Sequence, residues 1–454
     1  MSFQSINPAT GEVLETFEET APAVLDRILE RADAASRDWR RQPVRARAER
    51  LRAAGRILRE RKAAYARTMA LEMGKPLAQG VGEAEKCAWA CDYYAEHAEA
   101  FLAEQPRETD ATRSYVRFDA IGPVLAIMPW NFPFWQVFRF AAPALVVGNA
   151  GILKHAANVS RCALEIEAVV RDAEFPDGLF RSVFLPPQAV GAVIADPRVR
   201  AVTLTGSDRA GSQVAEQAGR HIKKTVLELG GSDPFIVLED ADVTRAAKTA
   251  VEARLINSGQ SCIAAKRFIV VDRVADRFIA QFTTEMRARS VGDPLDPATA
   301  VGPQARLDLR ANLHRQVQES VARGAQAVLG GELPQGPGAF YPPTVLVAVQ
   351  HGMPAFDEET FGPVAAVTRA KDEADAIRLA NASTYGLGAS VWTEDRKRGE
   401  RVAQAIEAGS VFVNGLVKSD PRLPFGGVKR SGYGRELSEY GLREFVNIKT
   451  VWVA

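Results

Sequence analysis

The spacing of hydrophobic positions changes along this chain. From residue 22 to residue 104, apolar residues recur at helical spacing among many alanines, arginines and glutamates, which predicts a run of helices. Met73-Gly74-Lys75-Pro76 divides that run, because glycine and proline end helices. Residues 114–119 then alternate apolar and polar side chains, as a half-buried strand does.

From residue 124 onward, short apolar runs alternate with helical segments. Strands are predicted at residues 124–128, 151–154, 182–185, 201–205, 225–229, 268–271, 363–368, 389–393 and 411–414. Strands that alternate with helices form mostly parallel sheets with right-handed crossovers, so the predicted fold class is α/β. The apolar tail at 445–453 predicts a last strand, and its edge is expected to pair with another strand of this chain or of another subunit.

Composition narrows the class of protein. With 454 residues, 46% of them hydrophobic and 25% charged, the chain is long enough for two or three globular domains. Its 57 basic and 56 acidic residues give a net charge of +1, which argues against a nucleic-acid partner. No signal peptide and no apolar run long enough to cross a bilayer is visible, so we expect a cytoplasmic protein with no membrane partner. The four cysteines and five histidines are scattered, which predicts neither a disulfide framework nor a metal site.

Three segments carry the residues of acyl chemistry. Cys262 follows the turn Gly259-Gln260-Ser261 and is the candidate nucleophile, although a lone cysteine is more often a small buried hydrophobe. An ordinary thiol, with a pKa of about 8.5, is mostly protonated at neutral pH, so the site must lower that pKa or supply a base. Glu228, which has apolar neighbours and precedes two glycines, is the candidate base. Asn131 is the candidate oxyanion donor, and by itself it would be interpreted as a turn residue.

Two further segments suggest a nucleotide. Gly206 and Ser207 follow the predicted strand at 201–205 and precede a helical segment, a junction that offers backbone N–H groups to a phosphate. This junction is not the GxGxxG motif and is weak support by itself. Lys154 lies at the end of another predicted strand, where open α/β sheets bind ligands, although a surface lysine is an equal alternative.

Taken together, these segments resemble the aldehyde dehydrogenase superfamily over nearly the whole chain, in particular its compact bacterial succinate-semialdehyde dehydrogenases. The matching segments are Pro129-Trp130-Asn131-Phe132-Pro133, Leu153-Lys154, Leu204-Thr205-Gly206-Ser207, Glu228-Leu229-Gly230-Gly231, Gly259-Gln260-Ser261-Cys262, Glu358-Glu359-Thr360-Phe361-Gly362-Pro363 and Pro424-Phe425-Gly426-Gly427. So many motifs in one order leave little room for chance.

The resemblance implies three structural parts. These are a Rossmann-like dinucleotide-binding domain at 1–107 and 123–231, an α/β catalytic domain at 232–430, and a small β oligomerisation element at 108–122 and 431–454. It also implies that Cys262 attacks the aldehyde, that Asn131 and the Cys262 N–H hold the oxyanion, and that Glu228 activates the water that hydrolyses the thioester. A homodimer or a dimer of dimers is the implied assembly.

The resemblance assigns the remaining cofactor contacts as well. Lys154 and Glu359 are expected at the two riboses, Gly206 and Ser207 at the pyrophosphate, and Phe361 near the nicotinamide. Trp130 is expected on the adenosine side, with Leu229 as a further contact. Related chains that prefer NAD often carry a glutamate where this chain has Ala157, so the 2′-phosphate of NADP is not repelled here. We expect NADP or NAD to serve, with a lean to NADP.

The substrate prediction rests on Arg139, in the apolar segment Phe138-Arg139-Phe140. Semialdehyde-specific relatives resemble this chain in having arginine there, and a guanidinium suits a carboxylate. The alternative is an arginine that snorkels to the surface. Ser419 resembles a further carboxylate contact, and Trp135, Gln136 and Ser261 are expected to shape the same tunnel. The hypothesis is oxidation of succinate semialdehyde through a cysteine thiohemiacetal and thioester. A general or glutarate-semialdehyde dehydrogenase and, remotely, a cofactor-independent thiol esterase are the alternatives.

Overall fold

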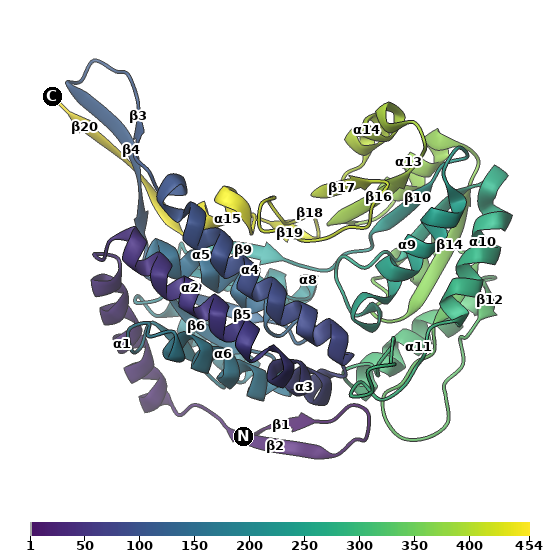
Figure 1. The fold of residues 1–454 in the computed structure, drawn as a ribbon, viewed down its shortest axis with the longest axis horizontal. Coiled ribbons are helices and arrows are strands. Elements are labelled where there is room, and N and C mark those ends of the chain that lie inside the picture. The colour runs from purple at the N-terminus through teal and green to yellow at the C-terminus, as the bar shows by residue number, and fades with distance from the viewer. Residues whose placement is uncertain (1) are drawn as a thin grey trace.

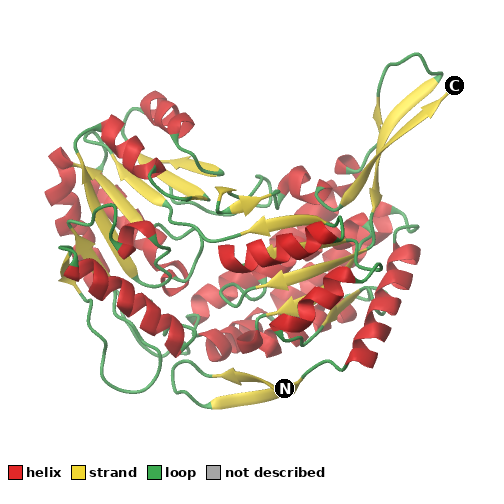
Figure 2. Cartoon of the chain, turned by 180° about the vertical axis from the view of Figure 1, so that it is seen from behind, coloured by secondary structure: helices red, strands yellow, loops and turns green. Residues whose placement is uncertain are grey.

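The computed structural model describes residues 2–454 as two α/β bodies joined side by side, with a narrow β ribbon projecting from the first (Figures 1 and 2). In Figure 1 the ribbon extends toward the upper left and carries the C-terminus. Within the described residues, no helix combines the length and apolar character that a membrane span needs. Each body buries its own apolar core against a central sheet.

The N-terminal third is helical, as predicted. A hairpin of β1 (Ser2–Ile6) and β2 (Val13–Glu18) precedes the helices α1 (Pro22–Trp39), α2 (Val44–Glu60), α3 (Lys62–Met73) and α4 (Leu77–Phe101). Gly74, with φ 77°, ends α3 in the left-handed conformation, and Pro76 immediately precedes α4. The predicted break at 73–76 is therefore confirmed.

The first sheet runs in the order β19-β9-β8-β5-β6-β7, and only β19 is antiparallel to its neighbour. Its strands are β5 (Pro123–Met128), β6 (Ala150–His155), β7 (Phe180–Ser182), β8 (Ala201–Thr205), β9 (Lys224–Glu228) and β19 (Gly432–Tyr433). The connecting helices are α5 (Trp135–Val147), α6 (Ser160–Asp172), α7 (Val190–Ala195) and α8 (Asp208–Arg220). The strand predicted at 182–185 was placed too late, because the sequence from Pro186 turns into a 3-10 helix instead of following the sheet.

The second sheet runs in the order β12-β13-β14-β11-β10-β16-β17. Its strands are β10 (Pro234–Val237), β11 (Arg267–Val271), β12 (Gln326–Leu329), β13 (Thr344–Val347), β14 (Val364–Ala370), β16 (Gly388–Trp392) and β17 (Ser410–Val413). Its helices are α9 (Val243–Leu255), α10 (Asp272–Arg287), α11 (Leu307–Ala322), α12 (Pro354–Asp357), α13 (Glu373–Asn381) and α14 (Arg396–Ala405). The predicted strands near 268, 363, 389 and 411 are confirmed within two residues.

The ribbon has the order β20-β4-β3, built from β3 (Gln105–Pro106), β4 (Arg113–Ala120) and β20 (Val446–Val453). The tail strand thus pairs with the strand near 114–119 of its own chain, with Val446 opposite Ala120 and Val453 opposite Arg113. The residues between 431 and the start of β20 were expected to belong to the oligomerisation element, but they pack with the first body. β19 extends the first sheet and α15 (Ser438–Arg443) packs on α5, because Leu437, Leu442 and Phe445 fill the first core.

Candidate active site

A strained loop between the two bodies carries the candidate nucleophile. After α9, Asn257, Ser258 and Gly259 take left-handed φ angles of 52°, 55° and 78°. Non-glycine residues in that region cost about 1–3 kcal/mol each, so the loop persists only because its surroundings hold it. At Gly259 a Cβ would lie 2.1 Å from the Gly362 carbonyl oxygen, so no other residue fits. The bend brings Cys262 to the surface of an internal cavity.

Lys266 holds the far side of this loop. Its fully buried ammonium donates hydrogen bonds to the carbonyl oxygens of Ser261 at 2.9 Å, Cys262 at 2.7 Å and Ala264 at 3.0 Å. A buried lysine with three acceptors fixes the backbone on both sides of the sulfur. The sequence-based analysis missed this residue. The available signal was a pair of adjacent basic residues, Lys266 and Arg267, between two apolar runs.

The surroundings of Cys262 keep its thiol protonated. The side chain is 8% exposed, and burial raises its pKa well above the ordinary value, with the negative charge of Glu228 acting in the same direction. Arg139 and Lys266 oppose that shift only in part. Of the two possibilities left open by the sequence, the site supplies a base and does not lower the thiol pKa.

Glu228 is the carboxylate that best fits the role of this base. It ends β9 and is buried, and its Oε2 accepts a hydrogen bond from Arg139 Nη2 at 3.1 Å. Its other oxygen has no protein partner within residues 2–454. That oxygen is therefore available to accept a proton.

Asn131 is tied to the nucleophile loop although it is distant in sequence. Its side-chain amide donates to the Gln260 carbonyl oxygen at 3.2 Å, and its own carbonyl oxygen accepts from Asn257 Nδ2 at 2.6 Å. A side-chain amide has two N–H donors, so one stays available for an oxyanion. The sheet edge after β5 and the bend before Cys262 thus form one connected unit.

The cavity beside Cys262 has a volume of about 230 Å³. All five predicted substrate contacts line it: Trp135, Gln136, Arg139, Ser261 and Ser419. Its lining is otherwise mostly apolar, as small-molecule sites are. The structure therefore brings together the residues that the sequence assigned to one tunnel.

The guanidinium of Arg139 is buried and paired, so the alternative of a surface-snorkelling arginine is wrong. It lies 3.1 Å from a Glu228 oxygen and 2.5 Å from a Glu436 oxygen, and it donates to Thr205 Oγ1 at 3.2 Å. Its role as substrate anchor stays a prediction, because its charge is already compensated by protein carboxylates. The sequence-based analysis missed Glu436. Burial raises the pKa of Glu436 to about 7, and Arg139 opposes this shift.

The predicted cofactor contacts gather at the carboxyl edge of the first sheet. From β5 the chain adds β6 and β7 on one side, then β8 and β9 on the other, so the topological switch point lies between β5 and β8. Open α/β sheets bind dinucleotides at that point. Trp130 follows β5, while Gly206 and Ser207 follow β8, and Ser207 Oγ caps α8 by accepting from the Ala210 N–H at 3.3 Å.

Two neighbouring positions suit an anionic cofactor. Lys154 is the last residue but one of β6. Burial lowers its pKa, and within residues 2–454 no carboxylate forms an ion pair with it. Ala157 is exposed and adds no negative charge. Burial lowers the pKa of His155 to about 4, so His155 is neutral and supplies no second cation. The residues at this edge fit a bound dinucleotide.

Glu359 reaches this edge from the second body. Its Oε1 accepts from the Gly231 N–H at 3.0 Å, and a Cβ on Gly230 would lie 2.5 Å from its Oε2. Leu229 is buried nearby, against Gly211 of α8. The rings of Trp130 and Phe361 meet edge to face at 5.7 Å. That contact disagrees with the expectation that they serve opposite ends of an extended cofactor.

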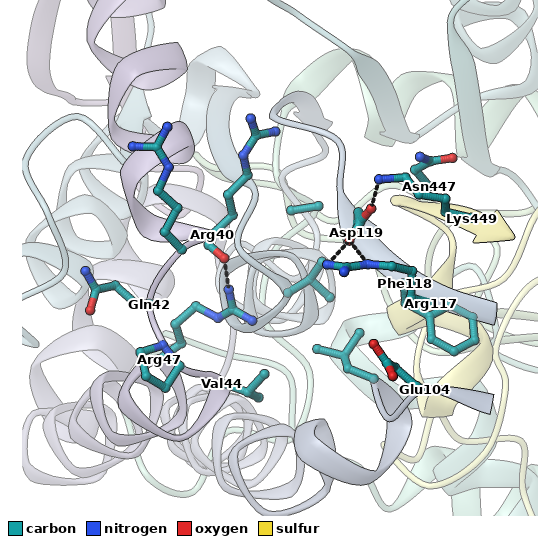
Figure 3. Close-up of a pocket in the computed structure, with 15 residues that line it drawn as sticks. Arg40, Gln42, Val44, Arg47, Glu104, Arg117, Phe118, Asp119, Asn447 and Lys449 are labelled. Atoms are coloured by element: carbon teal, nitrogen blue, oxygen red, sulfur yellow. Dashed lines mark hydrogen bonds and ion pairs between the residues drawn. The ribbon is translucent and has the colours of Figure 1, made fainter. Parts of the chain in front are cut away.

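A second, larger cavity of about 700 Å³ lies elsewhere, at the root of the ribbon (Figure 3). None of the predicted site residues lines it. Part of its charge is compensated: Arg117 and Lys449 both pair with Asp119, and Arg47 donates to the Arg40 carbonyl oxygen at 3.1 Å. Size therefore does not mark the candidate active site, which is chosen for its candidate nucleophile and base.

Comparison with known proteins decides the family. The model of the aldehyde dehydrogenase family matches residues 1–451. The chain belongs to the aldehyde dehydrogenase family. Among curated members, a probable NADP-dependent succinate-semialdehyde dehydrogenase of Synechocystis is 48% identical over 454 residues, covering all of both chains. An NADP-dependent succinate-semialdehyde dehydrogenase of Mycobacterium tuberculosis is 50% identical over 457 residues, again covering both chains completely.

A solved aldehyde dehydrogenase structure agrees in fold. The succinic semialdehyde dehydrogenase of Streptococcus pyogenes, crystallised with NADP+, superimposes with a TM-score of 0.97 at 40% identity and covers 99% of each chain. The predicted α/β class is confirmed as the aldehyde dehydrogenase fold.

Proposed function

We propose that this protein oxidises succinate semialdehyde to succinate with NADP as the preferred oxidant. The observation that carries the proposal is one small cavity lined by the buried thiol of Cys262, by polar groups suited to a carboxylate, and by Arg139, which donates a hydrogen bond to the candidate base Glu228. The full-length likeness to two enzymes named for this reaction supports it.

The protein's own groups account for the acyl steps. Glu228 takes the proton of Cys262, and the sulfur attacks the aldehyde carbon to give a thiohemiacetal. Asn131 Nδ2 and the Cys262 N–H are suited to hold its oxyanion. When bound, the nicotinamide cofactor supplies the hydride acceptor, and loss of hydride leaves a thioester on Cys262. After it has released the first proton to solvent, Glu228 takes a proton from water, whose oxygen attacks the thioester carbon. The carbon–sulfur bond then breaks, the acid is released, and the thiolate of Cys262 regains a proton from Glu228.

A spectrophotometric assay tests the function. With NADP, we expect succinate semialdehyde to give the highest kcat/KM in a panel with glutarate semialdehyde and butanal, measured at the absorbance band of the reduced nicotinamide. Butanal has the same carbon count as succinate semialdehyde and no carboxylate. Equal kcat/KM values for the two would reject a semialdehyde-specific enzyme. Ester hydrolysis without any rise in absorbance would instead identify a thiol esterase.

The lean to NADP rests on Lys154 and Ala157. Ala157→Glu would place a carboxylate at the exposed position after Lys154, where it repels a 2′-phosphate. We expect its kcat/KM with NADP to fall about tenfold or more while that with NAD changes little. A wild-type preference for NAD of about a hundredfold would reverse the assignment.

The assembly proposed is a homodimer or a dimer of dimers formed through the ribbon. β20 is an edge strand, and Ile448 and Trp452 are 62% and 52% exposed on it. Exposed apolar edges of this kind usually pair with another chain. Ile448→Lys combined with Trp452→Lys should lower the mass found by sedimentation velocity. An unchanged mass would place the interface elsewhere.

A further inference from the structure

The larger cavity, at the root of the ribbon, collects positive charge from segments that are far apart in the sequence. It lies between the turn that joins α1 to α2, the residues after α4, and the ribbon strands β4 and β20 (Figure 3). Its volume of about 700 Å³ is that of a small-molecule site. The basic residues that line it are Arg40, Arg41, Arg47, Arg117 and Lys449, and the acidic ones are Glu104 and Asp119. Five basic against two acidic residues give the lining a formal charge of +3.

The two acidic groups are already engaged. Asp119 pairs with Arg117 at 2.8 Å and also with Lys449, so one positive charge of these three groups stays uncompensated. Glu104 pairs at 3.0 Å with Arg113, which does not line the cavity. Neither acid is therefore available to neutralise the arginines on the opposite wall, at the α1–α2 turn.

Arg47 is the buried cation of that opposite wall. It is 5% exposed, its Nη1 donates to the Arg40 carbonyl oxygen at 3.1 Å, and its Nε has no partner within residues 2–454. Figure 3 shows the guanidinium pointing from α2 toward the ribbon. Burial lowers the pKa of Arg47 to about 10, and no carboxylate opposes this shift, so the group is charged at neutral pH. A buried charge without a counter-charge is costly, and such groups are typical of ligand sites.

The start of α2 adds a second kind of donor to the same wall. Pro43 and Val44 line the cavity, no side chain caps this helix, and its first turn carries no acidic residue. The first N–H groups of a helix have no partner within it and carry positive partial charge, which favours a phosphate. A guanidinium fork likewise matches the oxygens of a phosphate. The helix start and the buried Arg47 thus point to the same class of ligand.

We propose that this cavity binds a dianionic phosphate group, held by Arg47 and the first turn of α2 and attracted by Arg40 and Arg117. The group is free phosphate or the phosphate of a small monoester, because both present the same oxygens to these donors. Since the α1–α2 turn and the ribbon both line the cavity, the bound phosphate links the ribbon to the first body. This site is separate from aldehyde oxidation, because none of the reacting groups lines it.

Isothermal titration calorimetry with inorganic phosphate tests the proposal. The assembled protein is saturated with NADP, which keeps phosphate out of the dinucleotide site. We expect one phosphate per chain, and a dissociation constant about tenfold or more higher in Arg47→Gln, because hydrogen bonds to a charged group are lost. Arg47→Lys keeps the charge without the fork and should lose less. No measurable binding to the wild type, or equal affinity in Arg47→Gln, would overturn the proposal.

A second pair of variants decides the question if the substitution of the buried Arg47 prevents folding. Arg40→Gln combined with Arg117→Gln removes two exposed cations from the lining and should weaken phosphate binding about tenfold. Arg273→Gln combined with Arg277→Gln removes two exposed arginines of α10 and is the matched control, which should bind phosphate as the wild type does. The same weakening in both double variants would reduce the effect to net charge and refute a specific site.

Hydrogen exchange followed by mass spectrometry locates the ligand without any substitution. In the NADP-saturated protein, inorganic phosphate should slow amide exchange in peptides that cover residues 40–50 and 113–120, relative to chloride at equal ionic strength. Slowing confined to residues 205–211 would place the phosphate at the edge of the first sheet and contradict the assignment. Glycerol 3-phosphate, with glycerol as its control, distinguishes the two sources. Tighter binding than inorganic phosphate identifies a monoester as the ligand, and weaker binding identifies free phosphate.

Discussion

Removing the Arg139 charge is the sharpest test of how the buried acids at this site are compensated. Arg139 is the counter-charge of both Glu228 and Glu436. Arg139→Met therefore leaves two uncompensated carboxyl groups in one buried region. Breaking a buried ion pair from one side costs about 3–5 kcal/mol of stability. We expect a loss in that range, moderated because one carboxyl can take up a proton.

The consequence for activity follows from the same charge balance. If the carboxyl that takes up the proton is Glu228, the base is lost, and both thiol activation and thioester hydrolysis slow. The variant should then lose kcat to a similar extent on succinate semialdehyde and on butanal. Urea unfolding at pH 7, with kinetics on both aldehydes, measures the two effects. Glu436→Gln in the Arg139→Met background removes one of the stranded acids, so the double variant should regain part of the lost stability.

The refuting result is specific. An Arg139→Met protein with wild-type stability and a loss confined to succinate semialdehyde would show that Arg139 binds substrate, as the sequence predicted. The charge-balance argument would then be wrong.

Three further variants test the remaining groups. Cys262→Ser should reduce aldehyde oxidation by more than about 10³-fold, measured by stopped-flow absorbance, because the alkoxide nucleophile is far harder to form than a thiolate. Lys266→Met leaves three buried carbonyl groups without a donor, so the free energy of unfolding should fall by about 3 kcal/mol or more and kcat should fall on every aldehyde. Burial raises the pKa of Glu436 from 4.5 to about 7, so the stability that its proton contributes is fully present below pH 4.5 and is lost as pH rises through 7. Glu436→Gln lacks this pH dependence. In urea unfolding, the free energy of unfolding of Glu436→Gln minus that of the wild type should therefore rise by about 3 kcal/mol between low pH and pH 8.

Much of the fold was predictable because it depends on local patterns. Helical spacing located α1 to α4, and Gly74 with Pro76 located their interruption. The strands of both sheets appear as short apolar runs, since a strand covered on both faces is apolar throughout. The strand β7 was misplaced because the apolar run continues past the point where the chain leaves the sheet. The extension of the first sheet by β19 was not visible, because two residues carry no periodicity.

The reacting groups were predictable for a different reason. Cys262, Glu228 and Asn131 lie close to glycines or prolines that mark the ends of strands and bends. Asn131 follows β5 and Glu228 ends β9, and the carboxyl ends of these parallel strands meet at one edge of the first sheet. The ordered motifs then matched a known family. Glu436 could not be found in this way, because it acts through a contact with a distant segment that no local spacing records. Lys266 was missed for another reason: it bonds to backbone carbonyl groups of its own loop, and such acceptors belong to every residue type.

The charge state of this site depends on such distant contacts. From the sequence alone, Arg139 attracts attention because it is a basic residue in an apolar segment. The structure adds that its guanidinium is paired with two acids, Glu228 and Glu436. A cation recruits an anion in proportion to the charge that its neighbours leave uncompensated. Specificity for a carboxylate is therefore a property of the pairings around the cavity, and residue type alone does not predict it.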